Sequence, residues 1–116
     1  MKIQKFEDII AWQKSKDLIL LLYTLFRTNK DYSFKDQLLR AAVSIMNNIA
    51  EGFERYSNKE LKNFLFIAKG SCGELRSMLY LALAVELHYL TQEEYDKTNE
   101  LSLEISRLLS GFIKTL

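Results

Sequence analysis

The segment from residue 55 to residue 80 carries basic and aromatic side chains at helical spacing. At 100° per residue, five cations fall within about 100° of one another on a helical wheel: Arg55, Lys59, Lys62, Lys69 and Arg76. Phe66 and Tyr80 lie in the same sector. Successive cations on one helix face can follow a phosphate backbone, and aromatic rings between them can stack on bases. The pattern is compatible with nucleic-acid binding, with a solvated face, or with an interface where Phe66 and Tyr80 contact a protein partner.

A second polar line precedes this segment. Arg40, Ser44, Asn47 and Glu51 recur at helical spacing, with Asn48 beside them. Their amide, guanidinium and carboxylate groups could hydrogen-bond to a phosphate or to another protein. We assign Arg40 as an auxiliary phosphate contact and Ser44, Asn48 and Glu51 as candidate partner contacts. An ordinary solvated helix face with i,i+4 pairing explains the same spacing.

Catalytic or metal chemistry has few residues to depend on. His88 is the only histidine, and Val85 stands where the Glu-x-x-His pattern of di-iron bundles would need glutamate. The only cysteine, Cys72, projects toward the apolar side of its helix. We therefore expect no enzyme activity, no catalytic residue, no metal ion and no cofactor. Gly70 and Gly73 lie inside a helix, where glycine is less stable than alanine, so we expect close approach of another helix to compensate. The alternative, a phosphate-binding loop, is disfavoured because its sequence pattern is missing.

These residues must be positioned by helices. The chain has 116 residues, no proline and only four glycines, and it contains twenty leucines but two valines. Apolar periodicity predicts helices over about 7–27, 34–54, 58–88 and 92–114. Ser33 is the expected cap of the second, and Ser57 and Thr91 open capping boxes with Glu60 and Glu94. Short connections favour one all-α domain, an antiparallel up-down-up-down four-helix bundle.

The distribution of charge and the surplus of apolar side chains indicate which partners the protein could bind, and the cysteine content indicates its cellular compartment. The net charge is +1, but residues 1–70 carry twelve Lys/Arg against eight Asp/Glu, and residues 71–116 carry four against seven. Apolar residues flank the main stripes, including Leu20, Leu21 and Leu81, which favours a homo-oligomer. A single cysteine and an apolar run of only nine residues at 18–26 predict a cytoplasmic protein without a membrane segment.

Several short motifs recur together in one known family. They are Phe6-Glu-Asp, Trp12-Gln13-Lys14, Gln37-Leu38, Arg40-Ala-Ala-Val-Ser44-Ile45, Asn48-Ile-Ala-Glu-Gly52, Arg55, Phe64, Ala68, Gly70-Ser71 and Glu74-Leu75. The chain resembles the four-helix-bundle proteins encoded by intervening sequences in bacterial 23S ribosomal RNA genes, the so-called S23 ribosomal protein family. The resemblance implies a ring-like homopentamer without established enzyme activity. It also implies kinship with the accessory protein of diversity-generating retroelements, which binds nucleic acid and contacts a reverse transcriptase.

Together these observations predict a non-catalytic oligomer that binds RNA or DNA through a basic helix face. The alternative is a protein-interaction scaffold, for example for a reverse transcriptase or another nucleic-acid enzyme, with no direct nucleic-acid contact.

Overall fold

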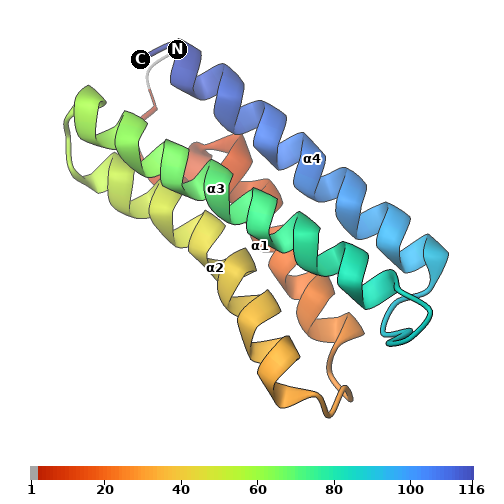
Figure 1. Cartoon of the computed structure of the whole chain (residues 1–116). Coiled ribbons are helices and arrows are strands. Elements are labelled where there is room, and N and C mark those ends of the chain that lie inside the picture. The colour runs from red at the N-terminus through yellow and green to blue at the C-terminus, as the bar shows by residue number, and fades with distance from the viewer. Residues whose placement is uncertain (1–2) are drawn as a thin grey trace.

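The computed structural model describes residues 3–116 and confirms an all-α, four-helix bundle (Figure 1). A short 3-10 helix, η1 (Phe6–Asp8), precedes the helices α1 (Ile10–Leu25), α2 (Tyr32–Glu54), α3 (Asn58–Leu83) and α4 (Gln92–Lys114). Long helices that are consecutive in the sequence pack against each other, and α4 closes the bundle against α1. Helices α1 and α3 therefore occupy diagonally opposite edges of the bundle, as do α2 and α4.

The first two helices begin differently from the sequence expectation. The continuous helix expected from residue 7 is divided, because Ile9 has an extended backbone between η1 and α1. Helix α2 starts at Tyr32, before the expected cap Ser33. Asp31 is the cap instead, and its carboxylate accepts a hydrogen bond of 3.2 Å from the amide of Phe34. An aspartate at this position satisfies one of the free amides of the first turn.

Helix α3 ends at Leu83, so the prediction that it reaches His88 was wrong. The chain turns at Ala84, and His88 adopts a left-handed conformation with φ 51°. The physical reason is tertiary: the turn buries Leu90, which is 1% exposed, and lets the Tyr89 hydroxyl donate to Asp31 at 2.6 Å. A continued helix would carry Leu90 away from the core and Tyr89 away from Asp31.

The two expected capping boxes differ. The box at Thr91 is complete: its hydroxyl accepts from the Glu94 amide at 3.1 Å, and the Glu94 carboxylate accepts from the Thr91 amide at 2.9 Å. Ser57 does cap α3 by accepting from the Glu60 amide at 3.3 Å. The Glu60 carboxylate, however, accepts from Arg55.

The apolar stripes meet in one core, as the periodicity predicts. Its fully buried side chains come from all four helices and include Leu18, Leu22, Leu38, Ile45, Ile49, Leu75, Leu79, Ile105 and Leu109. Leu65, Met78, Tyr95 and Ile113 are also buried, whereas Phe64, at a core position by helical spacing, is only half-buried. These positions lie at the edges of the stripes, where the neighbouring helix decides burial.

Within residues 3–116, no other helix closely approaches Gly70 or Gly73. A Cβ added at either position would have no atom within 4 Å. The close approach occurs at Gly52, where an added Cβ would lie 2.6 Å from the Cβ of Phe64. Gly52 therefore allows α2 and α3 to approach one another near their shared turn.

Candidate nucleic-acid interface

Most of the predicted cations lie on the outer face of α3. Lys59, Lys62 and Lys69 are exposed, and Arg76 is half-buried. The ring of Tyr80, on the same face, lies 5.4 Å from the ring of Tyr95 in α4. On the helical wheel the cations lie on the flank of α3 that turns toward α4.

The three lysines are free of ion pairs within the described part of the chain. Two of them, Lys59 and Lys62, lie in the first turns of α3, where the helix dipole adds positive potential. A basic residue is also present in the last turn of the antiparallel α4, namely Lys114. The start of α3 is therefore suited to attracting an anion.

Arg55 is held by carboxylates of its own chain. Its guanidinium lies 3.0 Å from a Glu51 oxygen and 3.3 Å from a Glu60 oxygen, and 5.1 Å from the centre of the Phe64 ring. The hydrogen bond to Glu51, assisted by both negative charges, raises the pKa of Arg55. The structure thus assigns this cation to the α2–α3 turn and not to the open face.

Arg76 is less open than the lysines. Its Nε atom is buried without a hydrogen-bond partner, close to Tyr95. Burial raises the pKa of Tyr95 to about 12, with a smaller contribution from the Tyr80 hydroxyl. Arg76 therefore belongs to a polar seam between α3 and α4, at the edge of the basic face.

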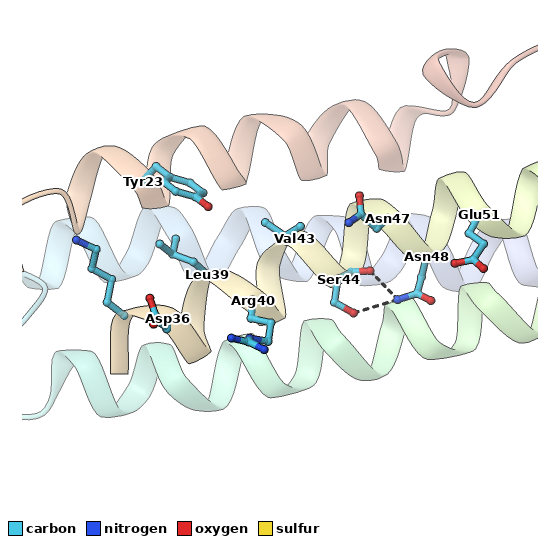
Figure 2. Close-up of a pocket in the computed structure, with 10 residues that line it drawn as sticks. Tyr23, Asp36, Leu39, Arg40, Val43, Ser44, Asn47, Asn48 and Glu51 are labelled. Carbon is cyan, nitrogen blue, oxygen red and sulfur yellow. Dashed lines mark hydrogen bonds between the residues drawn. The ribbon is translucent and has the colours of Figure 1, made fainter. Parts of the chain in front are cut away.

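The polar line of α2 borders a groove of about 680 Å³ (Figure 2). Its walls also include Tyr23 of α1. Ser44 and Asn48, like the paired Glu51, are used inside the chain: the Ser44 hydroxyl lies 3.0 Å from that of Ser71, and the Asn48 amide donates to the Ser44 carbonyl at 2.8 Å. The first of these bonds connects α2 to α3, and the second lies within α2. Arg40 is exposed along the groove and has no ion pair among residues 3–116.

The predicted aromatic residues of α3 remain uncovered. Phe66 is 52% exposed and Tyr80 is 60% exposed, and Ile67 and Leu81 are uncovered beside them. The wheel analysis missed a further aromatic residue, Tyr56, which is 86% exposed and has φ 54°. The sequence signal for this unusual residue is its position directly after the last turn of α2, where glycine is preferred.

The residues considered for metal and thiol chemistry are the His, Cys, Asp and Glu side chains. Across residues 3–116, three or more His, Cys, Asp or Glu side chains do not gather where they could hold a metal ion. Burial raises the pKa of Cys72 to about 12, so its thiol stays protonated. In the same described range, the helices are too short or too polar to cross a membrane.

Comparison with known proteins gives the chain its family. Residues 7–111 match the model of the 23S rRNA-intervening sequence protein family. A solved structure from Bacteroides thetaiotaomicron, described as a protein with unknown function from the S23 ribosomal protein family, is 31% identical with a TM-score of 0.80. The similarity covers 90% of this chain and 99% of that one. None of the curated proteins is similar enough to match. With this fold and these matches, the chain belongs to the 23S rRNA-intervening sequence protein family.

Proposed function

We propose that this protein acts by binding nucleic acid and not by catalysis, and that α3 supplies the main contact. The observation that carries the proposal is the row of exposed lysines Lys59, Lys62 and Lys69, which form no ion pair with residues 3–116. They span about 15 Å along the helix at 1.5 Å per residue. Exposed ammonium groups at this spacing can replace counterions along a phosphate backbone.

The test is a fluorescence-anisotropy titration of labelled structured RNA at increasing salt. The double variant Lys59→Glu, Lys62→Glu should bind much more weakly, and the slope of log K against log salt should fall by about 0.9 per lost phosphate contact. Lys30→Glu, Lys97→Glu is the matched control, because it makes the same change in net charge at exposed positions of the α1–α2 connection and α4. Absence of binding at low salt, or equal binding by the two double variants, would refute the proposal.

Self-association would strengthen such binding. Large apolar side chains are about half exposed on two faces: Ile10, Leu20 and Tyr23 on α1, and Ile67 and Leu81 on the flank of α3 that turns away from the lysines. Because α1 and α3 lie on opposite edges, contact between the two faces is head-to-tail and generates a ring when the rotation closes. We propose such a homo-oligomer, with the pentamer implied by the family resemblance as its expected size. Each ring would present several basic faces at once.

Light scattering at high protein concentration tests this association. Leu20→Lys and Leu81→Lys should each produce monomers, because a lysine would be buried in the contact. Val85→Lys is the control, since Val85 is 89% exposed in the α3–α4 connection. A monomeric parent protein, or assembly unchanged by both substitutions, would exclude the α1–α3 contact.

A protein partner is the second candidate. Arg40 favours it, because this residue lies beside the groove on α2 and forms no ion pair with the described residues 3–116. In that case Arg40→Ala should remove a co-purifying protein while leaving assembly intact. Loss of RNA binding in the same variant, with no change in protein partners, would instead assign Arg40 to phosphate.

A further inference from the structure

A second cavity lies at the end of the bundle that holds the α2–α3 turn and the C-terminal end of α4 (Figure 1). We call it the end pocket. It measures about 590 Å³, within the roughly 300–1,000 Å³ typical of small-molecule sites. Its walls come from three separate segments of the chain: Ile3, Gln4, Phe53, Tyr56, Ser57, Asn58, Leu61, Phe112 and Leu116.

Tyr56 is the unusual member of this pocket. It follows the C-cap of α2 in a left-handed conformation, with φ 54°, which disfavours residues other than glycine, asparagine and aspartate. The side chain is 86% exposed, so packing within the chain does not compensate for the strained backbone. A residue whose backbone strain is not offset by packing within the chain is a candidate for a binding role.

The chemistry around Tyr56 matches a nucleobase. Phe53, Leu61 and Phe112 supply apolar walls for the flat faces of a base, while the amides of Gln4 and Asn58 can address its polar edge. Lys59 directly follows the pocket residue Asn58 on α3, and Lys62 lies about one helical turn further along. A lipid chain or an apolar peptide would leave the amides and these cations without a role.

We propose that the end pocket binds one unpaired base of a single-stranded nucleic acid, with Tyr56 stacking on it and Lys59 and Lys62 contacting the flanking phosphates. This inference rests on the proposed function and specifies its ligand, since base stacking requires unpaired nucleotides.

The experiment compares Tyr56→Gly with His88→Gly. Both positions are exposed and left-handed, and they lie at opposite ends of α3, so both substitutions relieve the same backbone strain. The probe is a short fluorescein-labelled single-stranded oligoribonucleotide, measured by anisotropy beside an abasic oligonucleotide of equal length. Thermal unfolding of each variant is recorded in parallel.

We expect Tyr56→Gly to unfold at the same or a higher temperature than the parent, yet to bind the oligonucleotide about tenfold more weakly or worse. His88→Gly should share the thermal effect and bind like the parent. The abasic probe should bind weakly to all three proteins.

Three results would overturn the inference: unchanged binding by Tyr56→Gly, a marked loss of its thermal stability, or equal affinity for the abasic probe. If binding depends on Lys59 and Lys62 but not on Tyr56, only the end pocket is excluded. If the parent binds neither this oligonucleotide nor the structured RNA at low salt, the nucleic-acid function fails as well.

Discussion

Replacing Gly52 with alanine examines the close contact between α2 and α3 that organises the α2–α3 turn. An ideal Cβ at this position would lie 2.6 Å from the Cβ of Phe64, 3.3 Å from its Cγ and 3.2 Å from a methyl carbon of Leu61. The first of these atoms is attached directly to the α3 backbone. It cannot rotate away, so the two helices must separate for the methyl group to fit.

Two effects of opposite sign determine the magnitude. Alanine is favoured over glycine inside a helix by about 1 kcal/mol. Overpacking a close contact costs about 1–3 kcal/mol, and displacement of a helix backbone belongs at the upper end of that range. Gly52→Ala should therefore lower the free energy of unfolding by about 1–2 kcal/mol.

Urea denaturation followed by circular dichroism measures this change. Gly111→Ala is the matched control, because that glycine lies inside α4 and an added Cβ meets no atom within 4 Å. The control should raise the free energy of unfolding by about 0.5–1 kcal/mol. If Gly52→Ala stabilises the protein as much as Gly111→Ala, the α2–α3 contact described here is incorrect.

Three further predictions concern caps, the thiol and acid sensitivity. Thr91→Ala should lower the free energy of unfolding by about 1 kcal/mol in the same urea assay, because the hydroxyl that receives the Glu94 amide is lost; an unchanged midpoint would contradict the capping box. Cys72, 1% exposed and with a pKa raised to about 12 by burial, should resist iodoacetamide in the native protein and react after unfolding in urea, as followed by mass spectrometry; rapid native labelling would contradict its burial. The hydrogen bond from Tyr89, and secondly that from the Phe34 amide, lowers the pKa of Asp31, so its contribution to stability is present above the ordinary value of 3.8 and is lost as pH falls through the folded-state pKa. In urea titrations at neutral and acidic pH, Tyr89→Phe should therefore lose less stability on acidification than the parent, and an equal loss in both proteins would refute the role of this bond.

The number and order of the helices were predictable because their signals are local. Apolar residues recur with the helical period, and a hydroxyl side chain three residues before a glutamate marks a helix start. Thr91 and Ser57 therefore cap α4 and α3 as expected. The exposure of Lys59, Lys62 and Lys69 follows from the same periodicity.

The candidate sites were predictable only as sets of residues. The wheel placed Ser44 and Asn48 on a polar face, but it could not show that Ser44 lies 3.0 Å from Ser71, which is 27 positions away. It also grouped Arg55 with the cations of α3, although the turn between α2 and α3 brings Glu60 to it. The end pocket was missed for a similar reason, since its walls meet only when distant segments assemble.

By itself the sequence determined an all-α chain of four amphipathic helices and most of the core, because hydrophobic periodicity acts over a few residues. The tertiary structure decided where α3 ends, which glycine admits a neighbouring helix, and which polar groups remain free. Leu90, Gly52 and Arg55 each owe their role to a residue on another element, and the contact distances between elements do not exist until the helices pack.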